Sequence, residues 1–252
     1  MSDLEQFLTE HERISLFLDF DGVLVELAET PDAIEVPGRL PGQLERLKAV
    51  LDGAVAIVSG RGLAEIDRMI GPVRMPIAGD HGNQRRRPDG DMVWLNPAAQ
   101  SAAAKLADRL RSRVSEDDRL LVELKSSAVA LHYRRAPERE QFARNALQDA
   151  VADDPVWSTV TGKMVIEARA KGANKGEAVQ SYMGEVPFQG RVPVFIGDDV
   201  TDEDGFRAVQ DLGGAGIKVG PGNTCARFRI AGPSDVPALL DRLAREPRGD
   251  IA

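Results

Sequence analysis

The chain has 252 residues, of which 42% are hydrophobic and 29% are charged, a composition typical of a globular protein with one large or two modest domains. Its formal net charge of −8 repels phosphate backbones and anionic membrane surfaces, so we expect neither a nucleic-acid nor a membrane partner. The single cysteine, Cys225, cannot form an internal disulfide, and neither a secretion signal nor a run of about 20 apolar residues is present. These features predict a cytoplasmic protein.

The N-terminal third alternates short apolar runs with helical patterns. Residues 14–20 and 54–58 read as strands, and residues 40–51 and 63–70 carry the apolar spacing of helices. This β-α-β-α order predicts a parallel sheet covered by helices. The same alternation returns near the C-terminus, in segments 192–196, 203–209, 216–219 and 236–245. We therefore expect both ends of the chain to form one α/β domain.

The middle of the chain follows a different pattern. A predicted helix at 101–114 is followed by two short apolar runs, 120–125 and 128–133, which predict a hairpin. The order then recurs, with a helix at 138–151 and strands at 156–161 and 164–168. Two helix–hairpin units predict a small antiparallel sheet backed by two helices, which is an α+β domain.

Polar, turn-rich segments at 85–90 and 170–174 connect this middle part to the rest. They predict an inserted domain at 85–171 and a second domain built from 1–84 and 172–252. An insertion between strands of a parallel sheet leaves at the carboxyl edge, where such sheets place their ligand sites. The insertion is therefore expected to cover the site as a lid.

Acidic residues follow two of the predicted strands. Asp19 and Asp21 stand two apart at the end of the first strand, so both carboxylates can face one spot. Asp198, Asp199 and Asp202 follow the apolar run that ends at position 197. If these strands are neighbours, the carboxylates converge, and like charges that close repel unless a proton or a cation intervenes. Oxygen ligands without histidine or cysteine favour Mg²⁺.

Plainer interpretations of these acids remain open. An Asp-Gly pair after a strand is common turn chemistry, and acids at the start of a helix suit its dipole. An EF-hand loop is a further alternative for residues 19–22, but it needs a preceding helix. The strand-like run at 14–18 argues against it.

Two further polar groups stand at predicted element ends. Ser59 and Arg61 follow a buried strand, where a hydroxyl and a guanidinium are suited to holding a phosphate. Lys175 opens a helix just after the inserted segment and adds an ammonium group. Taken singly, each is also ordinary loop or surface chemistry.

In this order, the four motifs resemble those of the haloacid dehalogenase superfamily: DFDGV at 19–23, VSGR at 58–61, NKG at 174–176 and GDD at 197–199. Other segments resemble trehalose-6-phosphate phosphatases of the bacterial single-domain type: AGDHGNQRR at 78–86, ELK at 123–125, ALHYR at 130–134, GKMVIE at 162–167 and FIGDDVTDEDGF at 195–206. The resemblance runs from about Leu16 to about Leu240. It implies a Rossmann-like hydrolase core with an inserted α+β cap.

The resemblance also implies a reaction. Such a protein would hydrolyse trehalose 6-phosphate with Mg²⁺, in trehalose biosynthesis. Asp19 would attack phosphorus to give an aspartyl-phosphate, and Asp21 would act as general acid and then base. Ser59 and Lys175 would hold the phosphoryl group. The metal ligands would be Asp19, the Asp21 carbonyl and Asp198, with Asp199 or Asp202 acting through water.

Substrate-binding residues follow from the same resemblance. Those near the mouth of the site would be Arg61, His81 and Gly82, and those of the cap that grip the disaccharide would be Glu123, Lys125, Lys163 and Glu167. A solvated sheet face is the alternative for the cap residues. Core packing is one interpretation of His132, whose role is expected to be structural rather than catalytic. Val23 and Asp80 depart from close relatives, and Asp80 would add negative charge near the entrance.

Two other functions stay open. A related phosphatase could act on another sugar phosphate, such as sucrose 6-phosphate. An inactive domain could bind trehalose phosphate to regulate a synthase, although the intact Asp19, Asp21, Lys175 and Asp198 argue against it. We expect a monomer, with a trehalose-phosphate synthase as a possible partner.

Overall fold

The computed structural model describes residues 3–11, 13–27, 33–162 and 164–244. The chain divides into two compact units, which we call the core unit (residues up to Val93 and from Asn174) and the cap unit (Trp94–Ala173). The sequence predicts the first boundary earlier, between 84 and 85. It lies later because strands β4 (Gln84–Arg86) and β5 (Met92–Trp94) extend the sheet of the core unit.

An eight-stranded sheet in the order β12-β11-β10-β1-β2-β3-β4-β5 forms the centre of the core unit. The pairs from β12 to β3 are parallel, and β4 pairs antiparallel with β3. Strands β1, β2 and β11 are buried along their whole length, as expected of a parallel sheet covered on both faces. Besides β4 and β5, the strands of the core sheet are β1 (Ile14–Leu18), β2 (Val55–Val58), β3 (Ile77–Gly79), β10 (Val192–Gly197), β11 (Ala215–Val219) and β12 (Phe228–Ile230).

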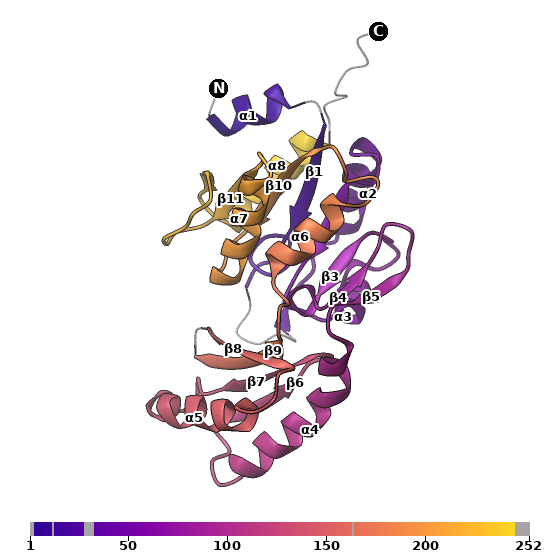
Figure 1. Cartoon of the computed structure of the whole chain (residues 1–252). Coiled ribbons are helices and arrows are strands. Elements are labelled where there is room, and N and C mark those ends of the chain that lie inside the picture. Colours follow the sequence, from indigo (N-terminus) through magenta and orange to yellow (C-terminus); the bar gives the residue numbers. More distant parts are fainter. Residues whose placement is uncertain (1–2, 12, 28–32, 163, 245–252) are drawn as a thin grey trace. The chain divides into compact units, whose positions relative to one another are not determined.

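Helices cover both faces of this sheet (Figure 1). α6 packs on α7, and α2 packs on α8. Along the chain, strands are added outward from β1 through β2 to β3, and then on the other side through β10 to β12. Right-handed crossovers in opposite directions, from β1 to β2 and from β10 to β11, place α2 and α7 on opposite faces, and α8 and α6 pack beside them. The core helices are α1 (Asp3–Glu10), α2 (Leu40–Val50), α3 (Leu63–Ile70), α6 (Lys175–Met183), α7 (Glu203–Asp211) and α8 (Val236–Leu243).

The cap unit is a four-stranded antiparallel sheet in the order β6-β7-β9-β8, packed against two helices (Figure 1). It has a hydrophobic cluster of its own, separate from that of the core unit. The two predicted helix–hairpin units are thus confirmed. Their elements are α4 (Pro97–Arg113), β6 (Leu121–Leu124), β7 (Ala128–His132), α5 (Glu140–Val151), β8 (Trp157–Gly162) and β9 (Val165–Ala170).

Arg85 and Arg86 belong to β4 of the core sheet and not to the polar link that the sequence predicts. Both terminal nitrogens of Arg85 donate to Glu185 at 2.8 Å, and Arg86 makes two bonds of 2.8 and 2.9 Å to Asp67. The same Arg85 guanidinium stacks 4.5 Å from the centre of the Tyr182 ring. Bidentate pairs of this kind fix geometry as well as charge, so β4 is anchored to α3 and α6.

No helix among the described residues is long and apolar enough to cross a membrane.

Candidate active site

The pairing of β1 with β10 brings together the acidic residues that follow these two strands. Leu18 is in register with Ile196, and the Asp19 amide donates to the Ile196 carbonyl at 3.0 Å. The chain reverses its direction of growth between these two strands, which is where parallel sheets place their ligands. One side-chain oxygen each of Asp19, Asp198 and Asp202 lies within 4.8 Å of the others. We call these three residues the acid cluster.

Lys175 lies against the acid cluster. Its Nζ is 2.8 Å from Asp19 Oδ1 and 2.6 Å from Asp202 Oδ1, and the residue is 2% exposed. The start of α6 places it there, because the Asn174 side chain caps the helix by accepting a hydrogen bond from the Glu177 amide at 2.9 Å. The structure therefore brings Lys175 and the acids together, although they are far apart in the chain.

Asp202 organises the turn after β10. Its Oδ2 accepts hydrogen bonds from the amides of Asp198 and Asp199, both at 2.9 Å. Asp202 is fully buried, whereas Asp199 is exposed. Of the two acids that the sequence places around a metal through water, Asp202 is the one that lies in the acid cluster.

The cluster carries more negative charge than its ammonium balances. Burial, with a further contribution from Asp202, raises the pKa of Asp19 well above its usual value, and Lys175 only partly offsets this. Burial likewise raises the pKa of Asp198 to about 7, with the charges of Asp202 and Asp199 adding to it. Burial alone would lower the pKa of Lys175, but Asp19 and Asp202 hold it above the usual value. Carboxylate oxygens with excess negative charge are the donor set that suits Mg²⁺.

Gly22 lets the first strand end approach the acid cluster. It has φ +72°, and a Cβ atom there would lie 2.1 Å from Asp198 Oδ2. Any side chain would therefore displace the carboxylate, besides being strained at this φ. The turn at Asp21 and Gly22 and the Asp198 carboxylate are packed directly together.

Asp21 is bound by Arg61. Nε and Nη2 of Arg61 donate to the two carboxylate oxygens of Asp21, at 2.7 and 2.9 Å, and Nη1 donates to Glu65. Arg61 is only 9% exposed. Arg61, which the resemblance assigns to substrate binding, thus binds Asp21, which the resemblance assigns to proton transfer.

The loop after β2 contacts the loop after β3. Ser59 is buried; its Oγ accepts from the Arg61 amide at 3.1 Å, and its carbonyl accepts from the His81 amide at 2.9 Å. The His81 ring lies against Gly60, where a Cβ would be 2.6 Å from Cε1 of that ring. A side chain at position 60 would therefore displace the His81 ring.

Residues 80–82 have positive φ angles, which are unusual for residues that carry a side chain. Asp80 has φ 49° and His81 has φ 55°, a region that costs non-glycine residues free energy and that is enriched at functional sites. Gly82 follows with φ +100°, and a Cβ there would lie 2.8 Å from the Asn174 carbonyl. Asp80 is 2% exposed, so its carboxyl group is buried beside His81.

The cap sheet presents a polar face opposite its helices. Glu123, Ala130 and Glu167 are paired across β6, β7 and β9, so their side chains point to the same side. Lys125 Nζ lies 2.9 Å from Glu167 Oε1, and Nε2 of His132 lies 2.8 Å from Glu123 Oε2.

His132 is thus half-exposed on this face and does not pack in the core as interpreted from the sequence. Its hydrogen bond lowers the pKa of Glu123, more than burial raises it. The fourth predicted sugar ligand, Lys163, lies outside the described residues.

Lys218, His132 and Glu65 are polar neighbours of site residues that sequence reasoning did not assign to the site. Lys218 stands in β11, where it donates to the Asp198 carbonyl at 2.6 Å. The available signal was a single charged residue inside the apolar run 215–219.

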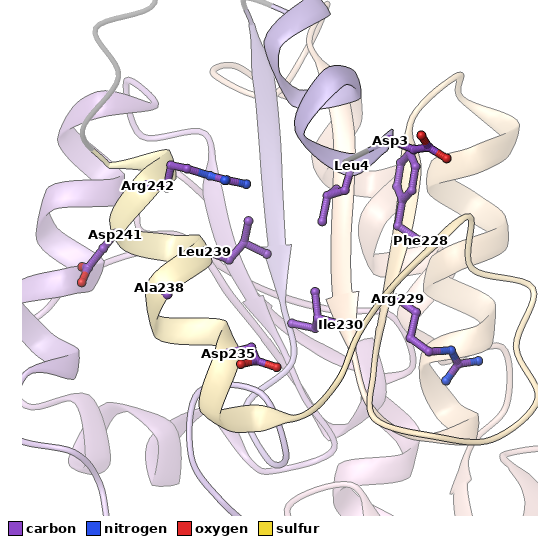
Figure 2. A pocket seen from close by; sticks show the side chains of 10 residues that line it. All are labelled: Asp3, Leu4, Phe228, Arg229, Ile230, Asp235, Ala238, Leu239, Asp241 and Arg242. Carbon is purple, nitrogen blue, oxygen red and sulfur yellow. The ribbon is translucent and has the colours of Figure 1, made fainter. Parts of the chain in front are cut away.

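A surface pocket of about 780 Å³ lies between α1, β12 and α8 (Figure 2). Leu4, Phe228, Ile230 and Leu239 supply apolar lining, and the charged Arg229, Asp235, Asp241 and Arg242 also border it. None of its lining residues belongs to the acid cluster. We assign it no part in the chemistry.

Comparisons with known proteins show which family this chain resembles. A family model described as trehalose-phosphatase matches residues 17–233. A probable trehalose-phosphate phosphatase of Sinorhizobium fredii is 46% identical over 223 residues, which cover 86% of this chain and 82% of that protein. The trehalose-6-phosphate phosphatase of Escherichia coli is 38% identical over 240 residues, which cover 94% and 90% of the two chains. The C-terminal domain of the Candida albicans enzyme of that name superposes with a TM-score of 0.80 at 25% identity, covering 96% and 95%.

Proposed function

Because the chain belongs to the trehalose-phosphatase family, we propose that it hydrolyses trehalose 6-phosphate to trehalose and phosphate through a Mg²⁺-assisted aspartyl-phosphate mechanism. The observation that carries the proposal is the buried Lys175 bridging Asp19 and Asp202 where β1 and β10 end. A nucleophilic carboxylate needs a cation beside it to accept a phosphate dianion.

Asp19 is the nucleophile of the first step. Its Oδ1 accepts from the Phe20 amide at 2.7 Å and lies 2.8 Å from Lys175 Nζ, which fixes the carboxylate and leaves Oδ2 to attack phosphorus. The bond from Asp19 to phosphorus forms while the bond from phosphorus to the sugar oxygen breaks. Lys175 and the Ser59 hydroxyl hold the phosphoryl oxygens in this step.

Asp21 moves the proton. It donates a proton to the departing sugar oxygen and then takes one from the water that hydrolyses the aspartyl-phosphate. Since both of its oxygens accept hydrogen bonds from Arg61, this pair has to separate before the proton is delivered. An incoming phosphate suits the Arg61 guanidinium as well as a carboxylate does, so we propose that substrate draws Arg61 away from Asp21.

Magnesium fits the acid cluster by its donor atoms and charge. Asp19 and Asp198 would hold it with the Asp21 carbonyl, and Asp202 would act mainly by orienting Asp198, Asp199 and Lys175. The ion supplies positive charge that neutralises the phosphoryl oxygens as they accumulate charge.

The sugar is bound by the cap unit in this proposal. Glu123, Lys125 and Glu167 stand on one sheet face and are charged groups that can donate to or accept from hydroxyls. The side-chain partners of the two carboxylates, His132 and Lys125, keep them in place before sugar arrives. Lys163 is proposed as a further sugar ligand on the resemblance alone.

The proposal is tested by measuring phosphate release with Mg²⁺ from trehalose 6-phosphate, sucrose 6-phosphate, glucose 6-phosphate and p-nitrophenyl phosphate. We expect a strong preference for trehalose 6-phosphate and no turnover after chelation of the metal. Equal activity on all four would retain the chemistry and remove the role given to the cap. No activity on any of them, with binding of trehalose 6-phosphate retained, would favour a regulatory binding domain.

A further inference from the structure

Lys218 is a buried cation that the mechanism above does not use. It lies in β11, whose five residues are all buried, and it is itself 5% exposed. Its Nζ donates to the carbonyl of Asp198 at 2.6 Å and to the carbonyl of Val219 at 2.7 Å. These two carbonyls lie just past β10 and at the end of β11, which are neighbours in the sheet.

The residue is costly where it stands. Removing an ammonium from water is unfavourable unless its hydrogen bonds are replaced, and both partners are backbone carbonyls rather than carboxylates. An apolar residue would extend the strand without that cost. The presence of a lysine at this position is therefore explained by the effect of its ammonium group on the turn after β10, which it binds through the Asp198 carbonyl.

That turn follows β10 and contains Asp198 and Asp202, two of the three residues of the acid cluster. Asp202 accepts hydrogen bonds from the amides of Asp198 and Asp199, and Lys218 binds the carbonyl of Asp198. The peptide groups on both sides of the Asp198 α-carbon are thus held by side chains. With its backbone held in this way, the Asp198 side chain leaves the chain in a defined direction.

We propose that Lys218 is a positioning residue of the metal site, which fixes the Asp198 backbone so that its carboxylate faces Asp19. The inference rests on the proposed function only for the identity of the metal. Its test needs no substrate, so a failure of the phosphatase assay and a failure of this inference are separate results.

The experiment is calorimetric titration of Mg²⁺ into the metal-free full chain and into Lys218→Met, which keeps the length of the side chain and removes the ammonium. We expect the magnesium dissociation constant to rise about 10- to 100-fold, the range found when groups that orient metal ligands are removed. Lys218→Gln serves as a second variant, since it is polar, shorter and uncharged, and we expect the same direction.

Arg191 provides a matched control. It is also a buried cation, 8% exposed, next to the amino end of β10, where it donates to the Pro187 and Ile14 carbonyls and to the Asp52 carboxylate. Arg191→Met should lower the denaturation midpoint but leave the magnesium dissociation constant within about threefold.

Three results would overturn the inference. Unchanged magnesium affinity in a folded Lys218 variant would make the residue purely structural, and equal weakening in Arg191→Met would make the effect one of general stability. Tighter magnesium binding would show that the charge of Lys218, and not its hold on the Asp198 carbonyl, dominates. Circular dichroism of each variant establishes that it is folded before titration.

Discussion

Asp19 is buried, its Oδ1 accepts a hydrogen bond from the Phe20 amide, and the Lys175 ammonium lies beside it. A substitution that keeps the shape of the side chain can therefore separate the chemical role of Asp19 from its structural role. Asp19→Asn keeps the shape of the side chain but removes the nucleophile. We expect kcat to fall by about 10⁴-fold or more, as when other enzymes lose their nucleophile, while binding of trehalose 6-phosphate persists. Phosphate release and calorimetric binding measure the two effects.

Asp204→Asn is the matched control, because Asp204 is a half-exposed acid of α7 whose ion-pair partner among the described residues is the nearby Arg207. It should retain wild-type turnover. If Asp19→Asn releases phosphate at the wild-type rate, the aspartyl-phosphate mechanism is wrong.

Asp198 makes stability depend on pH in a defined direction. Its pKa is about 7 in the folded protein against an ordinary value of 3.8, so between these values the folded state binds a proton that the unfolded state lacks. The free energy of unfolding of the metal-free protein should therefore fall as pH rises from about 4 to 7. The raised pKa of Asp19 acts with the same sign.

Magnesium should reverse this trend, because it binds the ionised carboxylates and competes with the proton. Urea denaturation at pH 5, 6, 7 and 8 should show stabilisation by Mg²⁺ that grows with pH. In Asp198→Asn the increment should be much reduced at every pH. A magnesium increment that is the same at pH 5 and pH 8 would contradict the assignment of Asp198.

At the scale of elements, the strand pairs decide which side chains can cooperate. In the cap sheet, β7 lies between β6 and β9 and contributes the small Ala130 between Glu123 and Glu167. A larger residue there would fill the space between the two carboxylates. The alternation along β9 sends Ile166, Ala168 and Ala170 to the helix side and Glu167 to the other.

In the proposed function, this arrangement separates sugar binding by the cap unit from the phosphate chemistry of the core unit. Lys125→Met should raise KM for trehalose 6-phosphate about 10- to 100-fold, because a charged hydrogen-bonding group that binds substrate is lost. It should leave kcat/KM for p-nitrophenyl phosphate unchanged, since that ester has no sugar. Steady-state kinetics on both substrates measure the split.

Arg119→Gln is the control for the cap unit, since Arg119 is a half-exposed cation that pairs with Asp117 and Glu138. It should change neither substrate's constants. A parallel loss of both activities in Lys125→Met would mean that Lys125 supports the fold and does not select the sugar.

At the scale of the whole molecule, each unit has a hydrophobic core of its own. The core unit is centred on β1, β2, β10 and β11, and the cap unit is centred on the helix side of its four strands. Cores without shared residues allow the units to unfold separately.

We therefore expect two transitions when the full chain is heated in a calorimeter, and Mg²⁺ should raise the midpoint of only one of them by mass action. In Asp198→Asn, neither midpoint should shift with Mg²⁺ as far as in the wild type. One transition that moves as a whole with Mg²⁺ would show that the two units unfold together.

The sequence by itself determined the local features of this protein. Apolar periodicity located most of the helices and strands, and the i, i+2 spacing of Asp19 and Asp21 placed acids at a strand end. The motifs at 19–23, 58–61, 174–176 and 197–199 indicated the superfamily. The segments at 78–86, 123–125, 130–134, 162–167 and 195–206 indicated the trehalose-phosphatase family, which the comparisons confirm. These signals are readable because they depend on residues that are near one another along the chain.

Only the tertiary structure decided which of those groups meet. Lys175 lies between Asp19 and Asp202, Arg61 binds Asp21, and Lys218 holds the carbonyl of Asp198. The arginines at 85 and 86, which look like a polar link in the sequence, instead anchor β4 through Glu185 and Asp67. Such partnerships depend on the order and register of strands that are distant in the chain, and on burial that removes water from the charges, neither of which is encoded in a local pattern of residues.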